Sequence, residues 1–368
     1  MKISIPLYQP SLNGNEKKYV LDCLETTWIS SKGKYCKLFE DKFAKKNNVN
    51  FALSVCNGTV AIHLALMTLD IGPEDEVIVP TLTFIASVNP IRYTGAKPIF
   101  VDSHKDTWQI DPYEIEKKIT SKTKAIIIVH LYGQPCDMDH IMKIARKHNL
   151  YVIEDCAEAL GSKYKNKFVG TFGDISTFSF FGNKTITTGE GGMVTTNNID
   201  LFKKCLHLKS QGLNQSEKKE YWHDILGYNY RMTNICSAIG MAQLEQLDEF
   251  IEKKRKLYEF YKKELKNLPI KMYEENSDSF NTHWLINILV DKSDIKENLR
   301  DHLTLNGIET RPIFIPIHKM PMYFKDKYNF PIADDLSARG ISLPSWPDIP
   351  RNDVVKICDE IKKFFNEK

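Results

Sequence analysis

Two kinds of apolar pattern alternate along the chain. Short runs of consecutive apolar residues end at turn residues, and longer segments follow in which apolar residues recur every three or four positions. The short runs are 51–55, 75–80, 97–102, 124–133 and 150–155. Runs without polar alternation are typical of strands buried on both faces of a parallel sheet. Because these strands alternate with helices, the pattern predicts an α/β fold with a large, mostly parallel α/β/α core.

The pattern changes after Thr233, which is a common N-cap residue type. Apolar residues then follow helical spacing as far as Leu265, which predicts one long helix over about 234–267. Beyond it, short strand patterns mix with helical ones. A chain of 368 residues is also long for a single core. We therefore expect a large domain over 1–245 and a small C-terminal α+β domain over 246–368.

Composition and charge narrow the class of protein. The 50 basic residues nearly balance the 47 acidic ones, which argues against a nucleic-acid-binding protein. The N-terminal sequence lacks the apolar core of a secretory signal, and no segment approaches the ~20 apolar residues of a membrane span. Eight cysteines are scattered without a C-x-x-C pair. We therefore expect reduced thiols and a cytoplasmic protein.

The turn after the first predicted strand has the features of a phosphate site. In VCNGTVAIHLAL (55–66), a strand ends at small residues and a helix follows. The free N–H groups and positive dipole end of a helix start favour an anion. Gly58 permits close backbone approach, and Thr59 adds a hydroxyl. The alternative is an ordinary N-cap without a ligand.

Two carboxylates end the predicted strand in YVIEDCAEALG (151–161). Ligands of open α/β sheets lie beyond the carboxyl ends of the strands, where Asp155 falls. Apolar residues on both sides predict burial, and a buried carboxylate requires a partner. Either Glu154 or Asp155 meets a buried cation, or both are solvated at the edge of the sheet.

Lys184 lies in FSFFGNKTITTGEGGM (178–193), between an aromatic run and a glycine-rich turn. The segment lacks the glycines of a Walker motif, which argues against a phosphate-binding loop of that type. The chain also has no G-x-G-x-x-G after a strand, which argues against a nicotinamide enzyme. We expect Phe178, Phe180 and Phe181 to surround the lysine and to favour its neutral, nucleophilic amine. Such an amine, a phosphate site and a strand-end carboxylate together predict pyridoxal phosphate.

Several longer motifs share one resemblance. They are TWISSKGKY, HLYGQPCDMD, TFGDISTFSFFGNKTITTGEGGM, YWHDILGYNYRMTNICSAIG and MPMY. With these motifs the chain resembles, over nearly its whole length, the nucleotide-sugar aminotransferases of the DegT/StrS family. The resemblance implies the aspartate-aminotransferase fold, also called fold type I of the pyridoxal phosphate enzymes. Within the family, the motifs are most similar to those of GDP-perosamine synthases.

The resemblance implies roles for matching residues. Lys184 would form the Schiff base with the cofactor and then shuttle a proton as general acid and base. Asp155 would keep the ring nitrogen of the cofactor protonated, Phe84 would stack on the ring, and Glu158 would lie near the phenolic oxygen. Some family members carry histidine in place of this lysine and are dehydratases. Lys184 therefore favours amino transfer.

The phosphate contacts implied by the resemblance come from two subunits. Gly58, Thr59 and Ser179 would bind the phosphate within one chain. Asn229 would reach the same phosphate from the neighbouring subunit, with Arg231 as the second choice for that role. The resemblance therefore implies a homodimer with shared active sites.

The resemblance also implies the substrates. L-glutamate would donate the amino group and leave the cofactor as pyridoxamine phosphate, and a keto-sugar would then accept it. The expected acceptor is GDP-4-keto-6-deoxymannose, the expected product is GDP-perosamine, and the expected destination is a surface polysaccharide such as lipopolysaccharide or capsule. A non-catalytic binding or regulatory protein on this scaffold would have lost Lys184 or Asp155, and both are present.

The acceptor end departs from the perosamine-synthase pattern. RPIFIPIHK (311–319) has Ile315 where tyrosine is expected, and Lys319 follows His318. The change removes a stacking face and adds a charge that suits phosphate. It is either neutral variation in a loop or the sign of another acceptor, such as a smaller phosphorylated ketone or another nucleotide-linked keto-sugar. Residues expected to border the acceptor, each with a structural role as the alternative, are Trp28, Ser30, Lys34, Arg231, Arg311, His318 and Lys319.

Overall fold

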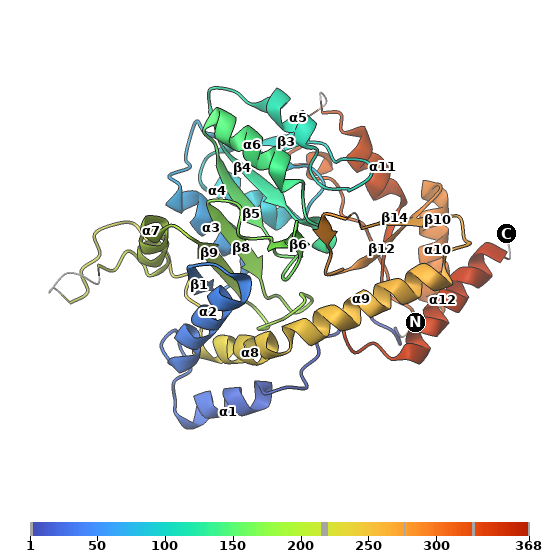
Figure 1. The fold of residues 1–368 in the computed structure, drawn as a ribbon, viewed down its shortest axis with the longest axis horizontal. Coiled ribbons are helices and arrows are strands. Elements are labelled where there is room, and N and C mark those ends of the chain that lie inside the picture. Colours follow the sequence, from blue (N-terminus) through green and yellow to red (C-terminus); the bar gives the residue numbers. More distant parts are fainter. Residues whose placement is uncertain (1–2, 215–219, 276, 326–327, 367–368) are drawn as a thin grey trace.

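A computed structural model describes residues 3–214, 220–275, 277–325 and 328–366. Its centre is a twisted seven-stranded sheet (Figure 1). Strand β9 runs antiparallel to both of its neighbours, and the other strands share one direction. In sheet order the strands are β1 (Phe51–Val55), β9 (Gly192–Thr196), β8 (Ile175–Ser179), β5 (Tyr151–Asp155), β4 (Thr123–Val129), β2 (Glu76–Pro80) and β3 (Lys97–Val101). The predicted mostly parallel sheet is thus confirmed.

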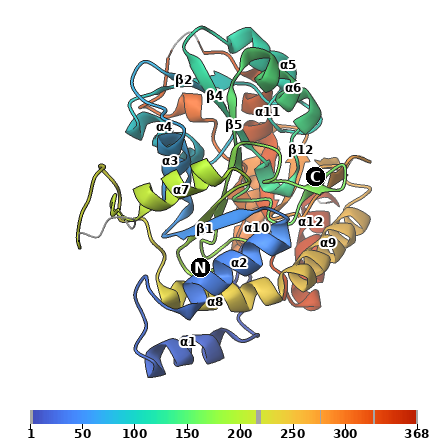
Figure 2. The same ribbon diagram turned by 60° about the vertical axis from the view of Figure 1, so that its left-hand side comes forward.

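Helices cover both faces of this sheet (Figure 2). On one face lie α3 (Gly58–Thr68), α4 (Asn89–Tyr93) and α7 (Ile199–Lys209). On the other face lie α2 (Lys34–Asn47), α5 (Pro112–Ile115) and α6 (Met138–His148). Helix α1 (Glu16–Glu25) lies beyond α8 (Asn234–Glu245), away from the sheet.

The strands are apolar throughout because each packs against both helix layers. On β4, Ala125 and Ile127 face the α3 layer, whereas Ile126 and Ile128 face the α6 layer. On β5, Ile153 belongs to the core on the α3 side, and its neighbour Val152 belongs to the core on the α6 side. Since side chains alternate along a strand, the two carboxylates that follow on β5 point to opposite faces.

A second, antiparallel sheet forms in the C-terminal part of the chain. In sheet order its strands are β10 (Ile270–Met272), β12 (Ile286–Val290), β14 (Gly340–Leu343) and β13 (Arg311–Pro312). The helices of this part are α9 (Leu247–Glu264), α10 (Ser293–Leu305), α11 (Pro331–Arg339) and α12 (Arg351–Asn366). A small three-stranded sheet orders β11 (Ser279–Phe280), β6 (Lys163–Tyr164) and β7 (Lys167–Phe168). Strand β11 therefore ties the C-terminal part to the segment that follows β5.

The single helix predicted over 234–267 is two helices in the structure. Helix α8 ends at Glu245 and α9 begins at Leu247. Between them Gln246 has ψ near 0°, its N–H bonds to the oxygen of Gln243, and its side chain donates to Glu16. Neither glycine nor proline marks this break in the sequence.

The core of the C-terminal part also includes a residue from the N-terminus. Ile5 pairs with Ile308 and is buried among the side chains of that core. The division into domains at 1–245 and 246–368 stays a prediction, and Ile5 shows that the first residues pack with the second part. Among the described residues, no helix is long and apolar enough to cross a membrane.

Candidate active site

Asp155 is a buried carboxylate at the carboxyl end of β5, on the α3 side of the sheet. The Ser87 hydroxyl donates to its Oδ2 atom over 2.7 Å, and the Ala157 N–H donates to its Oδ1 atom over 3.0 Å. Burial raises the pKa of Asp155, while these hydrogen bonds and the charge of Lys184 oppose the rise. The carboxylate of Asp155 is therefore a buried hydrogen-bond acceptor that suits a protonated ring nitrogen.

Lys184 follows β8 and directs its amine toward a second carboxylate. The Nζ atom lies 3.8 Å from the Oε1 atom of Glu158 and 3.9 Å from the centroid of the Trp284 ring. Burial lowers the pKa of the Lys184 amine, and the charges of Glu158 and Asp155 oppose this effect. A lowered pKa increases the fraction of neutral, nucleophilic amine.

The predicted aromatic surroundings of Lys184 are wrong in detail. Phe178 and Phe180 pack in the core on the α2 side of the sheet, and Phe181 is half-exposed. The apolar face beside the amine is Trp284, which lies 100 positions further along the chain. Alternation along β8 explains the error, because Phe178 points away from the face that carries Ser179. No local signal in the sequence could have identified Trp284.

Glu158 is buried between Lys184 and the end of β4. Its Oε2 atom accepts the Tyr132 N–H over 2.8 Å. Burial raises the pKa of Glu158 to about 7, although the Lys184 charge opposes the rise. Tyr132 has φ of 56°, a left-handed conformation that is uncommon outside glycine. This conformation turns its N–H toward the carboxylate, so the strained residue serves the site.

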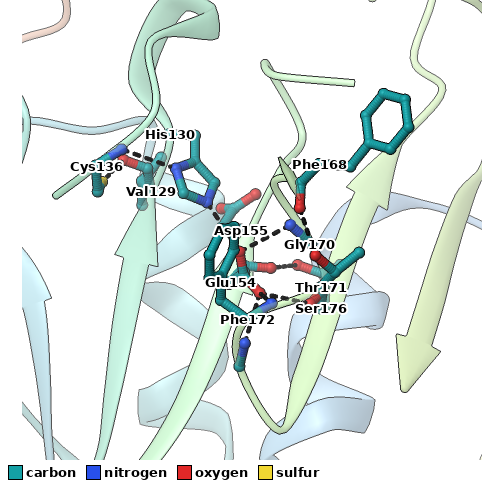
Figure 3. A network of polar contacts seen from close by, with 12 residues as sticks. Val129, His130, Cys136, Glu154, Asp155, Phe168, Gly170, Thr171, Phe172 and Ser176 are labelled. Carbon is teal, nitrogen blue, oxygen red and sulfur yellow. Dashed lines mark hydrogen bonds and ion pairs between the residues drawn. The ribbon is translucent and has the colours of Figure 1, made fainter. Parts of the chain in front are cut away.

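Glu154, on the opposite face of β5, holds a loop rather than a ligand (Figure 3). Its carboxylate accepts the N–H groups of Gly170, Phe172 and Gly173, each over 2.7 Å. It also faces the Nε2 atom of His130 over 3.2 Å. Because the Nδ1 atom of His130 accepts the Cys136 N–H, its Nε2 atom carries the proton.

The Glu154 network is therefore complete without a cation. Although Glu154, His130 and Cys156 have ligand atoms within 4.8 Å of one another, the oxygens of Glu154 are engaged by backbone N–H groups and by His130. The sequence left open which carboxylate of β5 meets a cation. The structure favours Asp155 as the carboxylate that meets a cation, because Asp155 lies on the same face of the sheet as Lys184.

The N-terminus of α3 has the shape of an anion cradle. A Cβ atom on Gly58 would lie 2.8 Å from the Cβ atom of Ser179, so only glycine lets the helix start approach β8 this closely. Asn57 caps the helix by accepting the Val60 N–H. The first N–H groups of a helix have no partner within the helix, so Gly58 and Thr59 can donate to an anion beside the Ser179 hydroxyl. This arrangement fits the phosphate of pyridoxal phosphate.

Aromatic side chains line the region between Lys184 and Phe84. The ring of Phe84, half-exposed, lies 5.7 Å from the ring of Phe314. Phe314 in turn stacks on Tyr132 at 5.3 Å, and Tyr132 stacks on Trp284 at 6.1 Å. Stacking of Phe84 on the cofactor ring stays a prediction. Phe314 was not predicted, although it lies in the segment where Ile315 replaces tyrosine.

The polar residues at the expected acceptor end have partners within the chain. His318 is buried, its Nδ1 atom lies 2.7 Å from the Thr81 hydroxyl, and its Nε2 atom lies 3.3 Å from Asp334. Lys319 pairs with the same Asp334 over 2.9 Å. Arg311 pairs with a neighbouring glutamate, Glu309, over 2.6 Å. These contacts favour the structural alternative for His318.

The remaining predicted residues lie around the start of α8. The carbonyl oxygens of Trp28 and Ser30 accept hydrogen bonds from Asn234 over 2.7 Å and 2.6 Å. Arg231 donates to the exposed side chain of Asn229 over 3.3 Å. Lys34, at the start of α2, pairs with Asp22. The hydrogen bonds and ion pairs of the described residues link none of the five predicted residues to Lys184.

Comparisons with known proteins agree with this geometry. The model of the DegT/DnrJ/EryC1/StrS aminotransferase family matches residues 10–362. The chain is 59% identical to a GDP-perosamine synthase of Escherichia coli O157:H7, covering 99% of both chains. It is 49% identical to a GDP-perosamine synthase of Vibrio cholerae, covering 98% of this chain and 99% of the other.

A solved structure agrees as well. The putative sugar aminotransferase Spr1654 from Streptococcus pneumoniae, in its PMP form, superposes with a TM-score of 0.94 at 26% identity, covering 99% of this chain and 98% of the other. The predicted fold and the predicted activity, amino transfer with pyridoxal phosphate, are confirmed. This chain belongs to the DegT/DnrJ/EryC1/StrS family of aminotransferases.

Proposed function

We propose that this aminotransferase moves an amino group from L-glutamate to the keto carbon of GDP-4-keto-6-deoxymannose, which gives GDP-perosamine. The observation that carries the proposal is the 59% identity to a GDP-perosamine synthase over 99% of both chains. The site contributes the chemistry, because a lysine amine of lowered pKa, Lys184, shares one side of the sheet with the carboxylate of Asp155. The predicted destination of the product is a surface polysaccharide.

Each group of the site has a distinct task in this proposal. Pyridoxal phosphate, when bound, supplies an aldehyde and a ring that accepts electrons. The Nζ atom of Lys184 would hold the cofactor and, when free, would take up and return the proton of the substrate carbon. The carboxylate of Asp155, whose Oδ2 atom accepts the Ser87 hydroxyl, would keep a ring nitrogen protonated. The Oε1 atom of Glu158 lies within reach to orient the amine between proton transfers.

The proposal includes binding of the phosphate group at the N-terminus of α3. The N–H groups of Gly58 and Thr59 and the hydroxyl of Ser179 would hold it. Phe84 would lie against the ring, since its half-exposed side chain belongs to the aromatic group beside Lys184. With the phosphate at α3, Asp155 would be the residue that holds the ring nitrogen.

A second copy of the chain completes the site in this proposal. Asn229 is exposed, and Arg231 donates to it from the same segment. Among the described residues of the same connection between α7 and α8, four large apolar side chains are exposed, and the most exposed are Tyr221 at 87% and Leu226 at 86%. Large exposed apolar side chains in one segment are typical of an interface. We infer a homodimer in which Asn229 of one subunit serves the phosphate of the other.

The contacts of the acceptor segment favour a nucleotide-linked sugar over a smaller phosphorylated ketone. The charge of Lys319 is paired with Asp334, so it adds less to phosphate binding than an unpaired lysine would. Phe314, which the perosamine-synthase pattern also carries at this position, is retained and stacks beside the site. Ile315 itself is 56% exposed.

A single-turnover spectrum tests the acceptor. L-glutamate converts the purified enzyme to the pyridoxamine phosphate form, excess glutamate is removed, and GDP-4-keto-6-deoxymannose is added. Prompt return of the absorption band of the lysine-bound cofactor is the expected result. If the first half-reaction proceeds but the band returns only with a small phosphorylated ketone or with another keto-sugar, the proposed acceptor is wrong.

The predicted cytoplasmic location is part of the proposal and is consistent with eight free cysteines.

A further inference from the structure

Two side chains from outside the large sheet donate to consecutive carbonyl groups at the catalytic lysine. The Tyr8 hydroxyl donates to the carbonyl oxygen of Lys184 over 2.7 Å. The indole Nε1 of Trp284 donates to the carbonyl oxygen of Asn183 over 2.6 Å. The face of the same indole lies 3.9 Å from the Nζ atom of Lys184. Trp284 thus contacts both the backbone next to the lysine and the lysine amine.

Helix α9 supports both donors. Lys254 and Tyr258 are four positions apart, so they lie on one face of the helix. The Lys254 amine is buried 5.2 Å from the centroid of the Tyr8 ring and donates to the carbonyl oxygen of Ser345 over 2.7 Å. Since the Ser345 N–H donates to the carbonyl oxygen of Leu7, the N-terminal segment is fixed next to Tyr8.

The residue before Trp284 has an uncommon backbone conformation. His283 has φ of 50°, in the left-handed region, which histidine enters more often than most residues other than glycine. Its ring stacks on Tyr258 with centroids 3.9 Å apart and an interplanar angle of 8°. Its N–H donates to the side chain of Asn281 over 2.6 Å. The stacking on Tyr258 and the hydrogen bond to Asn281 hold this backbone conformation directly before Trp284.

We propose that Tyr8 and Trp284 are positioning residues that hold the Lys184 amine in place whenever it is not bonded to the cofactor. A lysine side chain has several rotatable bonds, and a released amine would otherwise explore many positions before each proton transfer. The indole face attracts the ammonium form, and the two hydrogen bonds fix the backbone from which the side chain extends. The inference rests on Lys184 as the reactive amine and does not depend on which sugar is accepted.

Conservative variants test the proposal. Tyr8→Phe removes only the hydroxyl, and Trp284→Phe keeps a ring while removing the N–H donor. Tyr261→Phe is the matched control, because Tyr261 also donates from a buried hydroxyl to a carbonyl oxygen, that of Pro344, over 3.0 Å. The assay is the half-reaction with L-glutamate, together with thermal unfolding of each variant. A second assay uses cofactor-free protein, in which the rate of acylation of Lys184 is followed against pH by mass spectrometry.

The proposal predicts a change that a structural role would not produce. Tyr8→Phe and Trp284→Phe should each lower kcat for the half-reaction about tenfold, with KM for L-glutamate changed less than about twofold. In cofactor-free Trp284→Phe the pKa of the Lys184 amine should fall by about half a pH unit, because a phenyl ring attracts an ammonium less than indole does. Tyr261→Phe should unfold at a lower temperature with normal kcat.

The opposite pattern would overturn the inference. If both test variants lose stability as Tyr261→Phe does, and keep the kcat and the acylation profile of the parent protein, the two hydrogen bonds only stabilise the fold. A failed acceptor assay with a normal half-reaction with L-glutamate would affect the proposed sugar and leave this inference intact.

Discussion

The Oε1 atom of Glu158 lies 3.8 Å from the Nζ atom of Lys184, and both groups are buried at the end of the sheet. Burial disfavours both charges, so it raises the pKa of the carboxyl to about 7 and lowers the pKa of the amine. The pKa values of the two groups therefore lie closer together than their ordinary values do. A smaller difference between the two pKa values lowers the cost of passing a proton between these groups, which suits a lysine that shuttles protons.

This pair predicts a pH-dependent effect of Glu158→Gln on stability. The folded pKa of about 7 lies above the ordinary value of 4.5, so the folded state binds more protons than the unfolded state between these values. Stability contributed by this carboxyl is therefore present below about pH 4.5 and is lost as pH rises to 7. The variant should raise the free energy of unfolding of the cofactor-free protein by about 1 to 3 kcal/mol at pH 8, and by less at pH 5.

Denaturant unfolding at the two pH values measures this difference. Glu25→Gln, which changes an exposed carboxylate, is the matched control. Equal effects of Glu158→Gln at both pH values would mean that the buried carboxyl does not have a raised pKa.

Asp155→Asn should abolish most of the activity. The amide cannot hold a positive charge on a ring nitrogen, so kcat for the half-reaction with L-glutamate should fall by about 100-fold or more. Ser87→Ala removes the hydrogen bond to the Oδ2 atom and should cost less, about fivefold. Asp174→Asn is the matched control, because Asp174 accepts the Val152 N–H on the same strand, β5, away from Lys184. Comparable losses in the control and in Asp155→Asn would contradict a specific role for Asp155.

Lys254→Met should change how stability depends on pH. Burial lowers the pKa of the Lys254 amine to about 7 from 10.5. Between these values the unfolded state binds more protons, so the penalty from this lysine is largest at and below about pH 7 and fades as pH rises to 10.5. Between pH 7 and pH 10, the free energy of unfolding of the parent protein should therefore rise by about 1 to 3 kcal/mol relative to that of the variant. Parallel stability curves in urea across this range would show that Lys254 titrates normally.

Subunit complementation tests the proposed shared site. Lys184→Ala chains should be inactive and Asn229→Ala chains impaired when each is assayed alone. If Asn229 serves the partner subunit, a hybrid dimer contains one site in which both residues are intact. Equal mixing with subunit exchange should then restore about a quarter of normal activity. No recovery, with hybrids demonstrated by native mass spectrometry, would place Asn229 in the site of its own chain or outside the site.

Much of the fold and the centre of the site followed from local sequence patterns. Buried strands are continuous apolar runs, so β4 and β5 were visible, and Asp155 was placed at a strand end by chain order alone. The glycine at the start of α3 indicated a close approach, and the structure shows Ser179 as the neighbour that requires it. These features depend on residues within a few positions of one another.

The surroundings of Lys184 could not be predicted in this way. Tyr8 and Trp284 are 176 and 101 positions from the carbonyl groups they bind, so no window of sequence contains both partners. The neighbouring phenylalanines at 178 and 180 misled the prediction because side chains alternate between the two faces of an extended segment. His318 resembled a ligand residue in sequence, and only its buried contacts with Thr81 and Asp334 indicate a structural role.

The central claim is that Lys184 is the amine that bonds to the cofactor. Borohydride reduction of the protein loaded with pyridoxal phosphate makes that bond permanent, and peptide mass spectrometry then locates it. The account predicts the pyridoxyl phosphate adduct on Lys184 and its loss in Lys184→Ala. An adduct on another lysine, such as the buried Lys254 whose pKa is also lowered, or amino transfer that survives Lys184→Ala, would contradict it.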